Sequence, residues 1–384
     1  MRRESQRPED FLELLERSRR GKLKVYLGFA AGVGKTFRML EEAHVLRRRG
    51  VDVVLAYVEP HDRPETLALI DGLEVVPRKK LEFHGVTIEE LDLDAVLARK
   101  PTVAIVDELA HTNAPGLRHE KRYQDVAEVL DAGINVMTAL NIQHVESLND
   151  LILRATGVAV RETVPDAFIA QADQVVNVDV TVEDLVDRLK AGKVYGRDKI
   201  EQALESFFKT DKLESLREIA LREVAEDVSR KRDRKTTTSA VPRPEAPPAT
   251  ADRVLVCMAS NSPQAQALLR RGSRIAGRLN AKWYVVYVET PHESPVLVDA
   301  EVQRRLHENL ELARSLGAEV HKLEGTEVAR TILDFARSHS VQHVVIGRSF
   351  RPRWREILAG SFIDQLIRQA DGIDIHVVTV PGTP

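Results

Sequence analysis

The sequence predicts an α/β protein with two domains, each built on a doubly wound parallel sheet, and three observations lead to this prediction. Short apolar runs alternate with helical patterns along most of the chain. A segment rich in proline and basic residues, at 230–251, interrupts the alternation once. The length of 384 residues also exceeds what one ordinary hydrophobic core supports.

The first domain is expected over residues 21–229. Its short apolar runs predict buried parallel strands, because helical periodicity separates them. The strands are predicted at 23–28, 51–58, 101–108, 134–140 and 173–180. Helices are predicted at 35–49, 122–131, 143–154 and over most of 181–229. The stretch LEVVPRKKLEFHG, residues 73–85, predicts a short hairpin inserted between these units.

Three further segments complete the organisation. Residues 1–20 predict an N-terminal helical arm, because Phe11, Leu14 and Leu15 fall at helical spacing. Residues 230–251 predict a linker, extended where proline dominates. The second domain is expected over residues 252–384. Its five strands are predicted at 252–260, 281–289, 318–325, 341–349 and 374–380, with helices at 263–279, 297–316, 325–338 and 361–370.

Composition and charge narrow the classes of function. Hydrophobic residues make up 43% of the chain and charged residues 30%, which is typical of a soluble globular protein. A net charge of −3 gives no electrostatic basis for direct binding to nucleic acid or to an anionic membrane. The single Cys257 excludes an internal disulfide. No signal peptide and no membrane-length apolar stretch is present, so a cytoplasmic location is expected.

Residues 26–40, YLGFAAGVGKTFRML, contain a variant of the Walker A motif, G-x-x-x-x-G-K-[ST]. In such a P-loop, backbone amides wrap a phosphate, the lysine reaches the β and γ oxygens, and the hydroxyl holds Mg²⁺. The loop follows a predicted strand and opens a predicted helix, so a P-loop NTPase-like domain that binds ATP is expected. The predicted nucleotide contacts in the loop are Gly32, Val33, Gly34, Lys35 and Thr36.

The loop departs from the motif at its first glycine. Counting back from Gly34 places Phe29 at that position, and Gly28 lies one residue earlier. That glycine mainly eases the turn off the strand, and the charge-bearing positions are intact. The departure therefore leaves the expectation of phosphate binding in place.

A second motif follows at the end of the apolar run TVAIVDE. Asp107 ends a predicted strand, as a Walker B acid must in order to reach Mg²⁺. Thr36 and Asp107 are therefore the predicted magnesium residues. Glu108 is the catalytic candidate, because many P-loop ATPases polarise water with a glutamate at this position. The alternative for Glu108 is a structural carboxylate.

Other polar residues follow the predicted strand ends. Asn141 and Gln143 come after the run INVMTAL, where they can orient a water molecule or sense a γ-phosphate. The alternative for Asn141 is capping of the next helix. His111 and His144 show no metal-ligand spacing, so no metal other than Mg²⁺ is expected.

Several segments together resemble the cytosolic N-terminal region of the KdpD family of bacterial sensor kinases, which control high-affinity potassium uptake. They are GFAAGVGKTFRML, VDELAHTNAPGLRHEKRYQDVAEVLDAGINV, NIQHVESLND and AGKVYGRDKIEQALESFF. The resemblance covers residues 21 to about 230 and implies a nucleotide-binding regulatory domain. It implies that Gly34, Lys35 and Thr36 contact nucleotide and that Asp107 is the Walker B acid.

The second domain resembles the universal stress protein module of the same family. Nucleotide-binding members of that group carry G-x₂-G-x₉-G-[ST] around the phosphates. In this chain Phe350 stands at the middle glycine, and MASNSPQ lacks the acidic residue that follows the first strand in ATP-binding members. ATP is therefore not the expected ligand of this domain. Its candidate ligand residues are Ser260, Ser262, Gly347, Arg348, Ser349, Gly360 and Ser361.

Cyclic di-AMP is a further ligand candidate, because some KdpD relatives bind it through an S-x-S segment followed by an aromatic segment. Ser260 and Ser262 match the first part. In WYVVY, Trp283 and Tyr287 match the second part, whereas Tyr284 stands where a small residue belongs. Strand packing is the alternative for these aromatic side chains. Arg348, Arg351, Arg353 and Arg355 form a basic cluster suited to phosphate or to an acidic partner.

The resemblance also implies regions that this chain does not contain. A complete KdpD continues into membrane helices, a dimerising histidine helix and a kinase domain, whereas this chain ends at Pro384. No histidine kinase activity of its own is therefore expected. The chain is either a fragment of a membrane kinase or a short homologue that lacks the kinase.

The favoured hypothesis is a regulatory module that binds ATP and Mg²⁺ and acts on a sensor kinase or response regulator of potassium uptake. Such a module is expected in the cytoplasm, free or held at the membrane through its partner. One alternative is an active ATPase that uses Glu108, with Arg118, Arg122 and Arg154 as candidates for an arginine finger. Another is an interaction scaffold or a cyclic di-AMP receptor that acts through the second domain.

Overall fold

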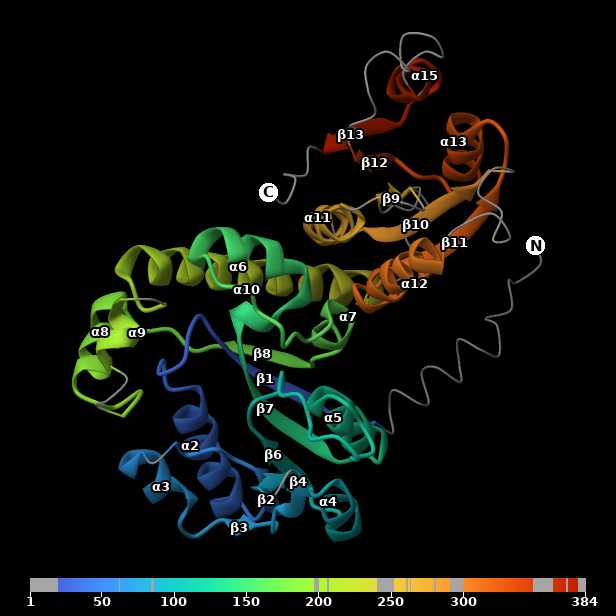
Figure 1. Ribbon diagram of the computed structural model, residues 1–384. Helices are drawn as coiled ribbons and strands as arrows, with labels where there is room; N and C mark the ends of the chain where they lie inside the picture. Colours follow the sequence, from blue (N-terminus) through green and yellow to red (C-terminus); the bar gives the residue numbers. More distant parts are fainter. Residues whose placement is uncertain are drawn as a thin grey trace. The chain divides into compact units, whose positions relative to one another are not determined.

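The computed structural model describes residues 20–239 and 252–378, apart from 62, 84–85, 197–199, 206, 260–261, 263, 280, 291–299, 348–361 and 371. The chain divides into two compact units, one of Met1–Val164 with Phe168–Asp227 and one of Pro165–Ala167 with Val228–Pro384. Figure 1 labels their helices and strands. The predicted N-terminal arm, except for Arg20, lies outside the described residues, and so does the proline-containing part of the predicted linker.

The first unit is built on a six-stranded sheet in which every strand pair is parallel. The strands are β1 (Leu23–Gly28), β2 (Val53–Tyr57), β3 (Glu74–Val75), β6 (Val103–Val106), β7 (Asn135–Asn141) and β8 (Gln174–Asn177). Their order is β3-β2-β6-β7-β1-β8, so β7 separates β1 from β6. The predicted doubly wound parallel sheet is confirmed.

Helices cover both faces of this sheet. Alternate residues of each strand point to opposite faces, so one strand contributes side chains to two cores. Tyr26 and Ile105 pack with Met39 and Leu40 of α2 on one face. Val25 packs in the core of the other face, to which α5 contributes. The helices are α2 (Lys35–Arg48), α3 (Pro64–Ile70), α4 (Leu93–Arg99), α5 (Arg122–Asp131), α6 (Asn149–Thr156), α7 (Asp166–Ile169), α8 (Val182–Lys190), α9 (Ile200–Glu205) and α10 (Thr210–Ser239).

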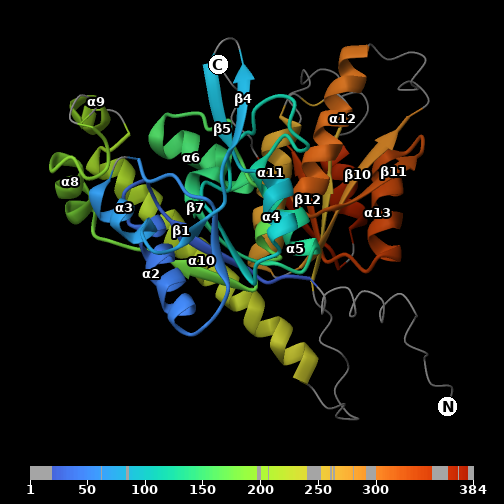
Figure 2. The ribbon, with the colours of Figure 1, turned by 90° about the horizontal axis from the view of Figure 1, so that it is seen from below.

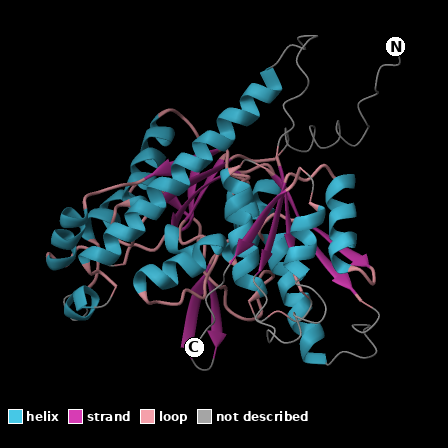
Figure 3. Ribbon diagram, turned by 90° about the horizontal axis from the view of Figure 1, so that it is seen from above, coloured by secondary structure: helices cyan, strands magenta, loops and turns pink. Residues whose placement is uncertain are grey.

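The predicted hairpin at 73–85 is wrong in its bounds. Glu74–Val75 is β3 of the main sheet, and the antiparallel pair consists of β4 (Lys79–Phe83) and β5 (Val86–Glu90). Pro77 interrupts strand pairing after β3, and Val-Thr-Ile at the start of β5 favours a strand. Figures 2 and 3 show the β4–β5 pair projecting from the body of its unit.

Two predicted helix boundaries also differ from the structure. The segment 143–154 begins as two short 3₁₀ turns, η1 (Ile142–His144) and η2 (Glu146–Leu148), because a bridge between Val145 and Val164 holds the chain between them. Helix α10 continues to Ser239, ten residues into the predicted linker. Lysine and arginine favour helix in this part, and no proline occurs before Pro242.

The second unit is a five-stranded parallel sheet in the order β11-β10-β9-β12-β13. Its strands are β9 (Arg253–Cys257), β10 (Lys282–Glu289), β11 (Glu319–Glu324), β12 (His343–Gly347) and β13 (Asp374–Val378). Its helices are α11 (Ala265–Arg278), α12 (Ala300–Ser315), α13 (Val328–Ser338) and α15 (Phe362–Gln369). The order reverses between β9 and β12, so this unit is also doubly wound, as predicted.

No helix within the described residues is both long enough and apolar enough to cross a lipid bilayer.

Candidate nucleotide-binding site

A cavity of about 1100 Å³ opens at the carboxyl ends of β1, β6 and β7. Parallel α/β sheets bind ligands at this edge, where the strand order reverses. The lining residues from the three strand ends include Lys35, Thr36, Asp107, Glu108 and Asn141. The structure thus brings together predicted site residues from three separate segments of the chain.

The loop between β1 and α2 presents its backbone to this cavity. Gly32 has a φ of 87° and Gly34 a φ of 102°, in the left-handed region that glycine adopts without strain. Helix α2 begins at Lys35, with no side-chain cap and no acidic residue in its first turn. The amide groups at the start of this helix therefore form a ready site for an anion.

The departure from the Walker A motif has a packing explanation. A Cβ atom on Gly28 would lie 2.6 Å from Val33 Cγ2, so this position requires glycine. Phe29, at the position of the missing glycine, is buried in the hydrophobic core with 1% of its surface exposed. The turn after β1 therefore uses Gly28, one residue before the glycine position of the motif, and Phe29 packs the loop into the hydrophobic core.

Lys35 is half-buried beside the phosphate-binding loop, and its ammonium contacts neutral acceptors. Its Nζ donates to Ala30 O at 3.0 Å and to Asn141 Oδ1. Burial lowers the pKa of Lys35 to about 8, against the opposing effect of Asp107. An ammonium group held by neutral oxygens in this way is free to exchange them for a phosphate.

Thr36 and Asp107 meet directly. Thr36 Oγ1 donates to Asp107 Oδ2 at 2.8 Å, and burial raises the pKa of Asp107. The hydroxyl and the carboxylate are hard oxygen ligands of the kind that Mg²⁺ prefers. Within the described residues no three His, Cys, Asp or Glu side chains group as a metal site. The residues present suit Mg²⁺, which usually takes one or two protein oxygens together with phosphates and water.

Glu108 lies beside Asp107 in a strained conformation. Its φ of 54° is unusual for a residue other than glycine, and such strain gathers at functional sites. His61 Nε2 lies 3.4 Å from one carboxylate oxygen, and Arg122 Nη1 lies 3.7 Å from the other. The contact with His61 holds the pKa of Glu108 below its ordinary value. Glu108 is therefore ionised at neutral pH, with one oxygen facing the His61 ring and the other facing the Arg122 guanidinium.

None of the three arginine-finger candidates lines the cavity. Arg122 is fully buried, with its Nη2 2.9 Å from Glu90 Oε2 and its guanidinium 3.8 Å from the centre of the Tyr57 ring. Arg118 pairs with two acidic side chains, and Arg154 pairs with Asp150 within α6. Arg122 thus contacts Glu108 from the protein interior. Arg118 and Arg154 pair with acidic residues that do not line the cavity.

The structure adds side chains to the cavity that the sequence patterns did not indicate. His61 and Arg63 precede α3. Arg188 lies near the end of α8, and the segment Ala191–Gly196 follows that helix. Arg188 Nη1 lies 3.4 Å from Gly32 O and from Val33 O. The sequence signals for this region are the pair of glycines in AGKVYG and the family resemblance of the segment AGKVYGRDKIEQALESFF, and neither indicates a place in the cavity.

The remaining histidine and amide candidates have structural partners. His111 Nε2 lies 2.9 Å from Glu90 Oε1, and His144 Nδ1 lies 2.7 Å from Glu162 O. Burial lowers the pKa of His144. Gln143 Nε2 lies 3.4 Å from the His144 ring. Both histidines line the cavity, where they help to fix the loops around it.

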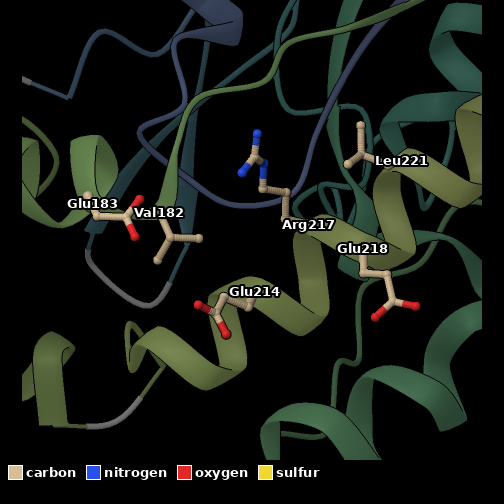
Figure 4. A pocket seen from close by; sticks show the side chains of 6 residues that line it. All are labelled: Val182, Glu183, Glu214, Arg217, Glu218 and Leu221. Carbon is tan, nitrogen blue, oxygen red and sulfur yellow. The ribbon is translucent and has the colours of Figure 1, made fainter.

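A second hollow of about 280 Å³ lies between the start of α8 and α10 (Figure 4). Its charged lining is mostly acidic, with Glu183, Glu214 and Glu218. The one arginine in the lining, Arg217, pairs with Asp179 at 2.6 Å. This hollow is therefore unsuited to a polyphosphate.

Only part of the predicted second-domain site lies in the described residues. Ser262 follows β9 and Gly347 ends β12, and the two strands pair with Ile346 opposite Cys257. Both residues therefore follow the strands at which the sheet order reverses. The other candidates, Ser260, Arg348, Ser349, Gly360 and Ser361, lie outside the described residues, as do Arg351, Arg353 and Arg355.

The aromatic residues of WYVVY belong to β10. Trp283 and Tyr284 are buried, with 6% and 3% of their surface exposed. Trp283 packs in one core of the second unit and Tyr284 in another. Their burial supports the strand-packing interpretation.

The fold and the cavity define a class of α/β proteins with doubly wound parallel sheets and a polar pocket at the carboxyl edge. The family profile described as the osmosensitive K⁺ channel His kinase sensor domain matches residues 19–228, and the universal stress protein profile matches residues 250–378. The chain belongs to the KdpD family.

Curated relatives differ in length. A KdpD relative from Synechocystis sp. is 44% identical, with 94% of each chain covered. Sensor protein KdpD of Escherichia coli is 43% identical over 98% of this chain, which spans 41% of that protein. Sensor protein KdpD of Mycobacterium tuberculosis is 42% identical over 95% of this chain and 42% of its own length.

Proposed function

We propose that this chain is a nucleotide-binding regulatory module of KdpD type, which binds ATP with Mg²⁺ in the cavity of the first unit. The observation that carries the proposal is the 2.8 Å contact between Thr36 Oγ1 and Asp107 Oδ2, next to the half-buried Lys35. A hydroxyl, a carboxylate and an ammonium meet there beside an uncapped helix start. These are the groups that a triphosphate with Mg²⁺ requires.

Binding would replace weak internal contacts with stronger ones. The Lys35 ammonium would leave Ala30 O and Asn141 Oδ1 for phosphate oxygens, whose negative charge makes them stronger acceptors for an ammonium than neutral oxygens are. Thr36 and Asp107 would hold Mg²⁺ in place of their mutual hydrogen bond. The metal would neutralise phosphate charge, and the amides of Gly32 to Gly34 would face the remaining oxygens.

Regulation by a protein partner is part of the proposal. The profile over residues 19–228 is that of a kinase sensor domain, and relatives such as the Escherichia coli protein are sensor proteins. We infer that the module acts in the cytoplasm on a sensor kinase or response regulator of potassium uptake. ATP can bias such a partner only by binding one conformation of the module better than another.

Isothermal titration with ATP and Mg²⁺ tests the proposal on the full chain. We expect saturable heat from the wild-type protein and its loss in Lys35→Ala. Lys190→Ala is the matched control, because Lys190 is exposed in the last turn of α8 and does not line the cavity. Equal heats from wild type and Lys35→Ala would contradict nucleotide binding at this site.

Hydrolysis is the second candidate function, and the geometry of Glu108 favours it. The residue follows Asp107 directly at the cavity wall in a strained backbone conformation, where its carboxylate can orient a water molecule. Its contacts with His61 and Arg122 would first have to open for it to reach a water molecule. Phosphate release that is saturable in the wild type and abolished in Glu108→Gln would establish an ATPase.

A ligand of the second unit is tested in the same titration. Ser262 and Gly347 follow β9 and β12, where doubly wound sheets bind ligands. Cyclic di-AMP is the probe. Heat that persists in Lys35→Ala and disappears in Ser262→Ala would assign it to the second unit, and no heat would remove this candidate.

A further inference from the structure

Arg63 lines the cavity of the first unit, and part of the hydrogen-bonding capacity of its guanidinium is unused. The residue is the N-cap of α3, and its Nη2 donates to Val194 O at 3.0 Å. Its Nε is buried and has no hydrogen-bond partner within the described part of the chain. Arg63 lines the cavity, and a guanidinium has five donor hydrogens, so the side chain can donate to a ligand oxygen once it leaves Val194 O.

The positive charge of Arg63 interacts with the negative charges of Asp107 and Glu108. Burial lowers its pKa from the ordinary value, and Asp107 and Glu108 act in the opposite direction. An arginine keeps its charge under such shifts. Arg63 is therefore a partly desolvated cation in the same cavity as Lys35, and it attracts a polyanion more strongly than a cation in bulk water would.

The partner of Arg63 belongs to a segment that lies against the phosphate-binding loop. We call residues 191–196 the cover segment. A Cβ atom on Gly32 would lie 2.5 Å from Val194 Cγ2, so the Val194 side chain packs directly on the loop. Lys193 Nζ is 2.7 Å from Glu65 Oε1, which ties the same segment to α3 a second time. In Figures 1 and 2, α3 and α8 lie at the same end of the first unit.

We propose that Arg63 reads the terminal phosphate of the nucleotide, and that its move from Val194 O to that phosphate releases the cover segment from α3. The ligand class is a nucleoside triphosphate as opposed to a diphosphate. The inference rests on the proposed function, because it places the nucleotide in this cavity. A charged phosphate is a stronger acceptor than a neutral carbonyl, so the exchange is favourable.

The cover segment connects this exchange to the last helix of the unit. The Tyr195 ring lies 5.7 Å from the Phe208 ring, centre to centre, in an edge-on contact. Phe208 is buried, with 2% of its surface exposed, two residues before α10 begins at Thr210. Release of the cover segment therefore alters the packing at the base of α10. This gives the triphosphate a structural effect that the diphosphate lacks.

Arg63→Gln is the test variant, because glutamine can still donate to Val194 O but carries no charge. Wild type and variant are titrated with the non-hydrolysable β,γ-imido analogue of ATP and with ADP, both with Mg²⁺. We expect the variant to bind the analogue about tenfold or more weakly, as suits the loss of a charge-assisted contact, and ADP within about twofold of wild type. Equal losses for both nucleotides would overturn the inference, because they would indicate a structural role alone.

Glu65→Gln is the matched control. It loosens the other tie of the cover segment, at Lys193, without removing a cation from the cavity. We expect it to leave the preference for the triphosphate unchanged. If it lost that preference as Arg63→Gln does, loosening of the segment rather than a phosphate contact would be the cause, and the inference would fail.

Hydrogen exchange of the full chain gives a second readout. In the wild type we expect the imido analogue to protect the loop around Gly34 and to speed exchange in the cover segment, whereas ADP protects the loop alone. In Arg63→Gln, the analogue should no longer speed exchange there. Unchanged exchange in the cover segment, with the loop protected, would contradict this inference and leave nucleotide binding intact. A loop protected by neither nucleotide would contradict both.

Discussion

Thr36 and Asp107 are 71 positions apart in the chain and are joined by a hydrogen bond of 2.8 Å. The strand order explains this contact. Strands β1 and β6 run parallel with only β7 between them, so their carboxyl ends face the same cavity. The side chain at the end of β7, Asn141, accepts a hydrogen bond from Lys35 between the two. Three strand ends thus form one polar site.

Asp107→Asn should remove most of the magnesium dependence of ATP binding. In the wild type, we expect affinity to fall about tenfold or more when EDTA removes Mg²⁺, a range typical of altered metal sites. The variant should bind ATP with nearly the same affinity in both conditions, because an amide is a poor magnesium ligand. Titration calorimetry with and without Mg²⁺ measures this difference.

Asp94→Asn is the control for that change. Asp94 is exposed and pairs with Arg118, and it does not line the cavity. It should keep the magnesium dependence of the wild type. An Asp107→Asn variant that also kept the full dependence would show that Asp107 does not serve the metal.

Gly32→Ala should destabilise the first unit more than Gly116→Ala does. Both glycines have positive φ values, 87° and 93°, so each substitution carries backbone strain of about 1–2 kcal/mol. A Cβ on Gly32 would also lie 2.5 Å from Val194 Cγ2, whereas one on Gly116 meets nothing within 4 Å. We expect overpacking to add about 1–3 kcal/mol at Gly32 alone. Urea unfolding followed by circular dichroism gives the two values, and equal losses would contradict the close packing of Val194 on the loop.

The strands and the loop could be predicted from the sequence because their signals are local. Val25, Tyr26 and Leu27 are all buried, since helices cover both faces of the sheet, and a continuous apolar run results. Asp107 follows one such run directly, and Lys35 comes seven residues after the end of another, behind a glycine-rich loop. Strand β3 gave no comparable signal, because two exposed residues are too few to show a pattern.

The rest of the cavity could not be predicted, because its residues meet only in the folded chain. Arg63 precedes a helix of seven residues, and Val194 lies in an irregular segment 131 positions later. Neither position belongs to a periodic pattern, and an arginine between two regular elements is common in any sequence. Gly32 shows the same limit: its φ suits the motif, but its contact with Val194 depends on how α8 returns to the loop.

Arg122→Met should cost the first unit about 3–5 kcal/mol, because it removes the guanidinium from the buried Glu90 carboxylate, which keeps its contacts with His111 and Ala114 N. Adding Glu90→Gln should recover at least about 1 kcal/mol of this loss, since the buried negative charge is then gone. Urea unfolding of both single variants and the double variant gives the coupling energy. Arg118→Met is the control, because its guanidinium is exposed and its loss should be much smaller than that of Arg122→Met. Strictly additive losses would show that Arg122 and Glu90 do not act as a pair.

Lys35 should take up a proton when the chain binds ATP in alkaline solution. Burial holds its pKa at about 8 in the free protein, so at pH 8.5 most molecules carry the neutral amine. A polyphosphate favours the charged form and raises this pKa, so binding draws a proton from the buffer. At pH 6.5 the amine is already protonated, and Lys35 should contribute no uptake. Affinity for ATP should accordingly fall as the pH rises above 8.

Titrations in buffers of different ionisation enthalpy measure that uptake. At pH 8.5 we expect a value above one half of a proton per ATP bound by the wild type. Lys35→Arg is the informative variant, because a guanidinium keeps its charge at this pH and should show no uptake from this position. The γ-phosphate is fully ionised at pH 8.5, so it contributes little. Uptake that persisted unchanged in Lys35→Arg would place the titrating group elsewhere and would remove Lys35 as the cation that meets the phosphate.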